Sequence, residues 1–432
     1  MQYYSTNNIK NKVSLKEAVL KGIADDGGLF MPEYIPQISK DFINNISSYS
    51  FQDIACHIAK LFCEEDIPTP ALYDIINSAI NFESPIVKLD EDTYVLELFH
   101  GPTFAFKDFG ARFTAKIMSY FINNQNNEIN ILVATSGDTG SAVANGFFNI
   151  PGINVTILYP SNKVSYLQEK QLTTLGGNIT ALEVGGTFDD CQRLVKNAFA
   201  DKTVSKIKNL SSANSINISR LLPQSFYYFN AYAQLKNKTK DLLFSVPSGN
   251  LGNLTAGLIA YKMGLPVYKF ISAVNANKVF EKYINTGEFI IKPSITTFSN
   301  AMDVGNPSNA ARIFELFENN FTKINNIIFS RSKSDEETLI AIEEVYDKYN
   351  YLIDPHGAVG YAVLHDYVDN QDVKYNSIIL ETAHPAKFTE VMEKAISDKI
   401  KLPEELKKCL LKEKVSIKIS NRYEEFKEFL IG

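Results

Sequence analysis

Four short segments of the sequence combine residue types that bind anions or attack carbonyl groups. One of them, VPSGNLGNLTAGL at 246–258, has a polar Gly-rich loop between a strand pattern and a helix pattern. The loop consists of Ser248, Gly249, Asn250, Leu251, Gly252 and Asn253. Its glycines let successive backbone N–H groups converge on an oxyanion, and the helix N-terminus adds roughly half a positive charge. The segment predicts a phosphate site without a lysine, although a Gly-rich connection that binds nothing fits equally well.

A second polar loop, in VATSGDTGSAVANGF at 133–147, again separates a strand pattern from a helix pattern. Hydroxyl groups lie beside two glycines in this loop, from Thr135, Ser136, Thr139 and Ser141. Together with backbone N–H groups they are suited to binding a carboxylate. Taken alone, a helix start capped near Asp138 or Thr139 is the more common explanation.

The segment HGPTFAFKDFGARF at 100–113 places Lys107 beside Phe106 and near Phe104 and Phe109, at an expected helix start. Partial desolvation and the positive end of the helix both lower the pKa of an amine, which favours the neutral form that attacks an aldehyde. Most lysines are solvated surface groups. Lys107 is therefore a candidate nucleophile only because the other three segments occur in the same sequence.

The fourth segment, SSANSINISRLLPQ at 211–224, offers amide, hydroxyl and guanidinium donors. They belong to Asn214, Ser215, Asn217 and Arg220. Arginine binds phosphate through two parallel hydrogen bonds, which favours a second anion site. A surface salt bridge is the more frequent role of an isolated arginine.

Several other enzyme classes are disfavoured. The five histidines form no HExxH pair, and no serine lies in a GxSxG motif. Neither GxGxxG nor a P-loop motif opens a βαβ unit, which argues against a Rossmann or P-loop enzyme. The cysteines have no metal-ligand spacing, so we expect no metal site and four reduced core thiols: Cys56, Cys63, Cys191 and Cys409.

An α/β architecture with mainly parallel sheets is predicted from Ile131 onward, where short apolar runs rich in β-branched residues alternate with helix patterns. The runs lie at 131–135, 155–159, 179–184, 242–246, 270–274 and 377–382. Ligands bind at the carboxyl ends of strands in such sheets, so these ends are expected to hold the site. A helix with one buried face is predicted from the four-residue spacing of Phe109, Phe113, Ile117 and Phe121.

The first 85 residues have a different pattern, with helical stretches at 14–22 and 51–65 on either side of the breaker-rich DDGGLFMPEYIP. We expect a separate, mostly helical N-terminal domain at 1–85. The Asn-rich stretch at 123–128 predicts a solvated loop.

The composition is that of an ordinary globular protein, with 432 residues, 45% of them hydrophobic and 21% charged. A net charge of −6 and a pI near 5.6 argue against a nucleic-acid or anionic-membrane partner. No apolar run approaches the roughly 20 residues of a spanning helix, and the first residues lack a signal-peptide core. The cytoplasm is the expected location.

In combination, the segments resemble the threonine synthases of the longer class found in bacteria and fungi, within the fold type II (tryptophan-synthase-β-like) pyridoxal 5′-phosphate (PLP) enzymes. The similarity covers essentially the whole chain through nine motifs in family order: ADDGGLFMPEYIP, HGPTFAFKDFGARF, TSGDTGSAVA, GTFDDCQ, NSINISRL, PSGNLGN, SNAMDVGNPSN, DPHGAVGY and TAHPAKF. A departure at Leu251, where many relatives have Phe, falls in a loop whose backbone binds the ligand.

The resemblance implies a role for each candidate residue. Lys107 is the Schiff-base lysine and catalytic residue, Asp138 and residues 248–253 contact the cofactor, and the Thr382 hydroxyl meets the pyridine nitrogen. The implied substrate contacts are Thr103, Ser136, Gly137, Asp138, Thr139, Asn214, Ser215, Asn217 and Arg220. The implied lobes are a smaller one at 86–220, which holds Lys107, and a larger one at 221–432, which holds the phosphate loop.

The reaction implied is the conversion of O-phospho-L-homoserine and water to L-threonine and phosphate, by a carbon–oxygen lyase that acts as a monomer or homodimer. A threonine dehydratase, a phospho-lyase and a non-catalytic metabolite-binding protein of the same fold remain alternatives. Arg220 and its neighbours disfavour the dehydratase, because its substrate has no phosphate.

Overall fold

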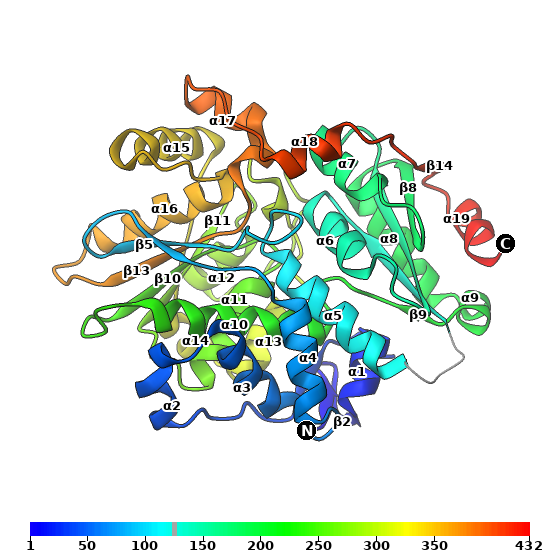
Figure 1. Cartoon of the computed structure of the whole chain (residues 1–432), viewed down its shortest axis with the longest axis horizontal. Coiled ribbons are helices and arrows are strands. Elements are labelled where there is room, and N and C mark those ends of the chain that lie inside the picture. The colour runs from blue at the N-terminus through cyan, green and yellow to red at the C-terminus, as the bar shows by residue number, and fades with distance from the viewer. Residues whose placement is uncertain (123–127) are drawn as a thin grey trace.

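A computed structural model of the chain describes residues 1–122 and 128–432. Within these ranges the strands form three sheets, of six, five and three strands. Figure 1 shows the two larger sheets side by side in separate lobes, each surrounded by helices. The predicted α/β architecture is confirmed. The loop expected at 123–128 lies, apart from Glu128, outside the described residues.

The six-stranded sheet has the order β12-β11-β10-β13-β5-β4. Its strands are β4 (Ile86–Lys88), β5 (Thr93–Glu97), β10 (Leu242–Pro247), β11 (Lys269–Val274), β12 (Ile328–Ser332) and β13 (Asn376–Glu381). Neighbouring strands are parallel except β4 and β5. Every residue of β10 and β13 is buried, as expected for strands of a parallel sheet that is covered on both faces.

The five-stranded sheet has the order β14-β8-β7-β6-β9 and is parallel throughout. Its strands are β6 (Ile129–Ala134), β7 (Ile153–Pro160), β8 (Ile179–Gly185), β9 (Leu210–Ser211) and β14 (Ile417–Ser420). The helices around it are α6 (Asp138–Phe147), α7 (Tyr166–Thr173), α8 (Phe188–Ala200), α9 (Lys202–Ile207) and α19 (Tyr423–Ile431).

All six apolar runs of the sequence form strands, namely β6, β7, β8, β10, β11 and β13. The strands that the pattern did not predict are short or polar. In β14, for example, only Ile419 of the four residues is buried. Such strands depend on pairing with a distant neighbour rather than on a local apolar run.

The sheets divide the chain differently from the expected lobe boundaries. β4 and β5 lie within 86–220 but belong to the six-stranded sheet, while β14 lies within 221–432 but belongs to the five-stranded sheet. Glu97 pairs with Glu381, and Ser420 pairs with Gly185. Both lobes are therefore assembled from separate parts of the chain.

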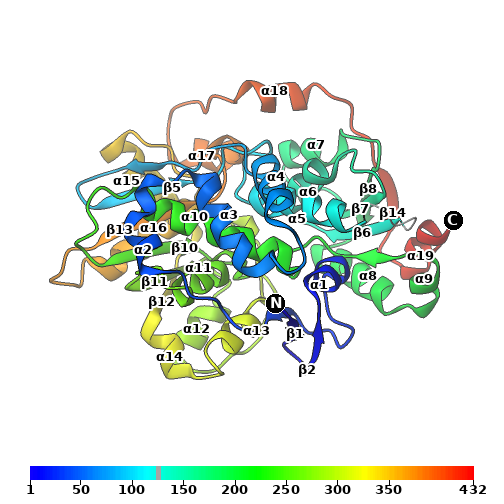
Figure 2. The same cartoon turned by 60° about the horizontal axis from the view of Figure 1, so that its bottom comes forward.

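The N-terminal residues form a three-stranded antiparallel sheet and four α-helices. The strands are β1 (Tyr3–Ser5), β2 (Asn8–Val13) and β3 (Phe30–Pro32), and the helices are α1 (Leu15–Lys21), α2 (Lys40–Asn45), α3 (Phe51–Cys63) and α4 (Thr69–Ala79). The helices expected at 14–22 and 51–65 are confirmed as α1 and α3. Figure 2 shows this region in front of the lobes, where α3 packs on α10 and α4 on α5.

Three helices form the centre of the molecule: α5 (Lys107–Ile122), α10 (Ile218–Gln234) and α11 (Gly252–Lys262). The predicted apolar stripe of α5 is buried along its whole length. α10 packs against both α5 and α11 and is buried at nearly every position. Lys107 is the first residue of α5, as the pattern predicted.

The remaining helices are α12 (Val279–Thr286), α13 (Ala310–Leu316), α14 (Phe321–Ile327), α15 (Asp335–Tyr349), α16 (Pro355–Val368), α17 (Thr389–Ala395) and α18 (Glu404–Leu410), with the 3-10 turns η1 (Ile46–Ser48), η2 (Asn300–Met302) and η3 (Pro385–Phe388). α16 packs on the six-stranded sheet, and α18 crosses from that lobe to α7 of the other (Figure 2).

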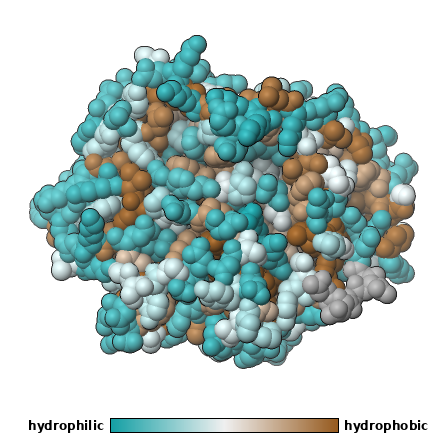
Figure 3. All heavy atoms as spheres, in the orientation of Figure 1, coloured by the Kyte–Doolittle hydropathy of each residue, from teal (hydrophilic) through white to brown (hydrophobic). Residues whose placement is uncertain are grey.

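The outer surface is mainly polar on the face that Figure 3 shows, with apolar patches between the polar side chains. Among the residues that the structure describes, none of the helices is long and apolar enough to span a membrane. Cys56, Cys63 and Cys191 are buried free thiols, as expected, and Cys409 is a free thiol that is only partly buried.

Candidate active site

A cavity of about 750 Å³ lies between the two lobes, at the carboxyl ends of β6, β10 and β13. It brings the four sequence segments together. Expected site residues that line it are Lys107, Ser136, Thr139, Asn214, Ser215, Arg220, Gly249, Asn250, Leu251, Gly252, Asn253 and Thr382. The helices α5, α6, α10 and α11 begin around this cavity, so their positive ends converge on it, an arrangement that favours anionic ligands.

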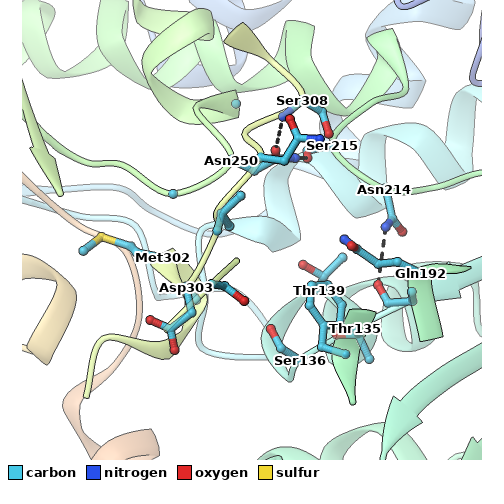
Figure 4. A pocket seen from close by; sticks show the side chains of 18 of the residues that line it. Thr135, Ser136, Thr139, Gln192, Asn214, Ser215, Asn250, Met302, Asp303 and Ser308 are labelled. Carbon is cyan, nitrogen blue, oxygen red and sulfur yellow. Dashed lines mark hydrogen bonds between the residues drawn. The ribbon is translucent and has the colours of Figure 1, made fainter. Parts of the chain in front are cut away.

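Figure 4 shows how the two walls of the cavity face each other. Thr135, Ser136 and Thr139 lie on one side, and Asn250, Met302 and Asp303 lie on the other. The first wall belongs to the five-stranded lobe and the second to the six-stranded lobe. A ligand in the cavity would contact both lobes.

The loop before α11 has the geometry of a phosphate cradle. Leu251 adopts a left-handed conformation with φ 60°, which turns the chain into the helix. Gly249 lies so close to the neighbouring turn that an added Cβ would be 2.6 Å from Met302 Cα. Among the described residues, no side chain caps the start of α11, so its first N–H groups are available to a ligand.

Asn253 is oriented by two tyrosines. The hydroxyls of Tyr227 and Tyr228 donate to Asn253 Oδ1 over 2.7 and 2.8 Å. The amide Nδ2 is buried and has no hydrogen-bond partner within the part of the chain that the structure describes. A buried donor of this kind is costly unless a ligand accepts its hydrogen bond, which fits an anion at the start of α11.

Lys107 lies at the cavity with 16% of its side chain exposed. Burial is the main reason why the pKa of its amine lies below the ordinary value. Asp138 opposes this shift, with Oδ2 4.0 Å from Lys107 Nζ, while the nearby Lys387 and Arg220 reinforce it. The environment favours the neutral amine needed for attack on an aldehyde.

Asp138 does not cap α6. The N-cap position belongs to Gly137, which has no side chain, and no side-chain cap is present among the described residues. Asp138 Oδ1 instead accepts from Lys387 Nζ at 2.6 Å and from Gln168 Nε2 at 3.0 Å. Burial alone would raise the pKa of the carboxyl, but Lys387 and Lys107 outweigh it and bring the pKa below its ordinary value. Asp138 is therefore a buried carboxylate that directly adjoins Lys107.

Arg220 lies in the first turn of α10 and is only 2% exposed. One terminal nitrogen donates to the backbone carbonyl of Ala213, and Nε is buried without a partner among the described residues. Burial lowers the pKa of the guanidinium to about 10, so it stays charged at neutral pH. Its positive charge and its unpartnered Nε make the Arg220 side chain suited to binding an anion in the cavity.

Five expected site residues, all described by the structure, do not line the cavity: Thr103, Gly137, Asp138, Asn217 and Ser248. Of these, Asp138 still reaches Lys107. The Asn217 amide donates to the carbonyls of Val19 and Ser212, both at 2.9 Å, and its oxygen accepts from Ser219 N–H at 3.0 Å. Asn217 therefore caps α10 and anchors α1, a role that leaves its amide no free donor for a substrate.

Thr103 and Ser248 are likewise engaged inside the protein. Thr103 Oγ1 donates to Asp108 Oδ1 at 2.6 Å, and Ser248 Oγ donates to the Val246 carbonyl at 2.8 Å. Their side chains stabilise the backbone next to Lys107 and next to the phosphate loop.

Comparison with known proteins gives three matches to family models that together span residues 2–430. A model described as Threonine synthase N terminus matches residues 2–80, Pyridoxal-phosphate dependent enzyme matches 80–381, and Threonine synthase, C-terminal matches 357–430. The threonine synthase of Haemophilus influenzae is 42% identical, and the alignment covers 100% of both chains. The chain belongs to the threonine synthase family.

Solved structures agree with this assignment. A threonine synthase from Escherichia coli superimposes with a TM-score of 0.94 at 39% identity, covering 100% of this chain and 99% of that one. A PLP-bound threonine synthase from Brucella melitensis gives a TM-score of 0.92 at 31% identity, with the same coverage. The predicted fold type II architecture, the lyase class and dependence on PLP are confirmed for this member of the threonine synthase family.

The residues at the cavity fit the cofactor of the threonine synthase family. A phosphorylated aldehyde requires an anion cradle and an amine, and the cavity has both: the loop before α11 with the unpartnered amide of Asn253, and Lys107, whose pKa is lowered by burial. Thr382 supplies a hydroxyl at the end of β13. In the described residues, no group of His, Cys, Asp and Glu side chains could hold a metal ion.

Lys387, Gln168 and His356 are site residues that the sequence patterns did not single out. Lys387 and Gln168 contact Asp138, and His356 lines the cavity and accepts from the Ala301 N–H at 3.2 Å. One signal was available for Lys387, because TAHPAKF directly follows a buried strand, where ligands bind in this architecture.

Proposed function

We propose that this protein converts O-phospho-L-homoserine and water to L-threonine and phosphate. The observation that carries the proposal is that one cavity holds two sets of anion-binding groups on different helices. The first set is the loop that opens α11, and the second surrounds Arg220 at the start of α10. A PLP enzyme needs one such set for its cofactor, and a second indicates a phosphorylated substrate.

In this proposal, Lys107 attaches the cofactor, residues 249–253 hold its phosphate, and the Thr382 hydroxyl meets the ring nitrogen. When bound, the cofactor supplies an electron sink for carbanions formed on the substrate, which is weaker with a neutral hydroxyl partner than with a carboxylate. The Gly249 backbone, packed against Met302, supports the assignment because a side chain there would displace the turn.

Substrate orientation is assigned to two groups of residues that line the cavity. Ser136 and Thr139, at the start of α6, bind the carboxylate through hydroxyl and N–H donors. Asn214, Ser215 and Arg220 bind the phosphate and neutralise charge as it leaves Cγ. Binding at both ends fixes Cα and Cβ near Lys107.

Proton transfer is assigned to Lys107. With the substrate amine bound in its place at the cofactor, the freed amine of Lys107 would remove the protons from Cα and Cβ. Phosphate would leave from Cγ and water would add at Cβ. The three protons released, from Cα, Cβ and the added water, would go to Cγ, to Cα and to the departing phosphate. The lowered pKa of the Lys107 amine supports this role, because a base must be unprotonated at the working pH. Asp138 adjoins the resulting ammonium.

An assay of the purified, PLP-loaded protein tests the proposal. With O-phospho-L-homoserine we expect equal amounts of phosphate and L-threonine, and no 2-oxobutanoate from added L-threonine. Formation of 2-oxobutanoate without phosphate release would establish the dehydratase alternative instead. Lys107→Ala should abolish threonine formation and the visible absorbance of the bound cofactor while the far-UV circular dichroism stays unchanged.

A further inference from the structure

Lys387 has no part in the proposed function, yet its side chain is completely buried, with 0% exposure. It lies in η3, one turn after β13 and the cavity residue Thr382. A buried ammonium is unfavourable unless charged and polar groups compensate it. Lys387 has both, because Nζ lies 2.6 Å from Asp138 Oδ1 and donates to the Thr103 carbonyl at 2.9 Å.

Asp138 is shared between two lysines. One oxygen accepts from Lys387, while the other lies 4.0 Å from Lys107 Nζ. Gln168 also donates to the first oxygen, so the carboxylate is held from α7 as well as from η3. The shorter contact is with Lys387, which is not the lysine that is proposed to bind the cofactor covalently.

We propose that Lys387 is a positioning residue that holds Asp138 and thereby keeps Lys107 available as a neutral amine. The inference rests on the proposed role of Lys107 as the lysine that captures the cofactor. If Asp138 were paired with Lys107 alone, the carboxylate would stabilise the ammonium form, which cannot attack an aldehyde. Lys387 opposes this in two ways, by occupying the carboxylate and by repelling a second positive charge.

The other charged groups around the two lysines do not replace this arrangement. Lys107 is affected by Arg220 from α10 and by Asp354 at the start of α16, in addition to Asp138 and Lys387. Lys387 also faces Asp108, whose carboxyl is bound by Thr103, and the neighbouring His384. Of these groups, Asp138 is the one in an ion pair with both lysines among the described residues.

Two single substitutions should act in opposite directions on Lys107. Lys387→Met removes the competing cation and should raise the pH at which Lys107 loses its proton by about one to three units. Asp138→Asn removes the anion but keeps Lys387, and should lower that pH. The double variant should return it towards the parent value, because one stabilising and one destabilising charge are removed together.

The measurement is the rate at which apoprotein captures added PLP, followed by absorbance across a pH series. The midpoint of the rise in rate with pH reports Lys107, and the ionisations of free PLP are common to all variants. Lys387→Arg, which keeps the charge, should retain the parent midpoint more closely than Lys387→Met. Lys394→Met, an exposed lysine on the next helix, is the matched control and should leave the midpoint unchanged.

Midpoints that stay at the parent value in both single variants, or that move in the same direction, would overturn the proposal and leave Lys387 with a purely structural role. If Lys387→Met does not fold, a downward shift in Asp138→Asn is still required. Lys107→Ala separates this failure from failure of the proposed function. Covalent capture should vanish in that variant, and if it persisted unchanged, Lys107 would not be the cofactor lysine at all.

Discussion

The side-chain amide of Asn250 donates a hydrogen bond to Ser215 Oγ over 2.8 Å. Asn250 lies in the loop before α11, and Ser215 lies in the segment before α10, so this bond joins the two proposed anion sites. The Asn250 oxygen is held in turn by the N–H of Ser308 at 2.6 Å (Figure 4). We therefore expect cofactor binding and substrate-phosphate binding to be coupled through this amide.

Ser215→Ala should weaken the binding of both ligands. The hydrogen bond from Asn250 is worth about 0.5–1.5 kcal/mol, so PLP affinity should fall roughly two- to tenfold, together with a rise in KM for the phosphorylated substrate. Titration of apoprotein with PLP and steady-state kinetics on the same preparation measure the two effects. A change in KM alone would show that the bond does not couple the sites.

Gly252→Asp should reduce PLP affinity, because it places a negative charge at the start of α11 where the cofactor phosphate is proposed to bind. Gly252→Ala is the matched control, since the nearest atoms to an added Cβ are 3.5 and 3.6 Å away, an ordinary contact distance. Excess PLP should partly restore activity to the aspartate variant. Equal PLP affinity in both variants would place the cofactor phosphate elsewhere.

Arg220→Ala should lower kcat/KM for the phosphorylated substrate by about ten- to more than a hundredfold, because a charge-assisted bond to phosphate is worth roughly 1.5–3 kcal/mol. A fall in kcat as well as a rise in KM would indicate that the arginine also stabilises the departing phosphate. The spectrum of bound PLP should be unchanged. Normal kinetics would remove Arg220 from the substrate site and reopen the dehydratase alternative.

Asn217→Ala should destabilise the protein without changing how it binds substrate. The substitution leaves the carbonyls of Val19 and Ser212 and the Ser219 N–H without their present partner, and we expect a loss of about 1–3 kcal/mol in the free energy of unfolding. Urea denaturation measures this loss. If KM rose while stability stayed the same, Asn217 would contact the substrate after all.

Glu381→Gln should stabilise the protein progressively as the pH rises. Burial, and then the neighbouring Asp354, raise the pKa of the Glu381 carboxyl well above its ordinary value. The folded state therefore holds this proton more tightly than the unfolded state does. The parent protein loses stability as the pH rises above about 4.3, the ordinary glutamate pKa, towards the folded pKa.

Glutamine has no carboxyl proton to lose, so the difference in unfolding free energy between the variant and the parent should widen as the pH rises above about 4.3. Chemical denaturation at several pH values measures it. A constant difference across that range would mean that the Glu381 carboxyl titrates normally.

The sequence patterns were reliable where one segment contained the whole signal. The buried strands, the start of α5 at Lys107 and the polar loops after β6 and β10 depend on local composition and spacing, and each was found. Asn217 shows the limit of this approach, because its neighbours Asn214 and Ser215 do line the cavity. Only the fold reveals that its amide points towards α1.

Lys387 and β14 show a second limit. The partner of Lys387 is 249 positions away in the chain, at Asp138, and β14 pairs with β8 more than 230 positions earlier. No local pattern specifies such contacts, because they depend on which distant elements the fold brings together.

The position of β14 at the edge of the five-stranded sheet has a consequence for synthesis on the ribosome. Residues 417–420 must emerge from the ribosome before β8 acquires its outer neighbour. In the six-stranded sheet, β13 must likewise emerge before it can pair between β10 and β5. During most of translation, the nascent chain therefore exposes unpaired strand edges, which are sites of aggregation. A chain released early, without its last few dozen residues, would keep the edge of β8 open and should be a preferred target of chaperones and proteases.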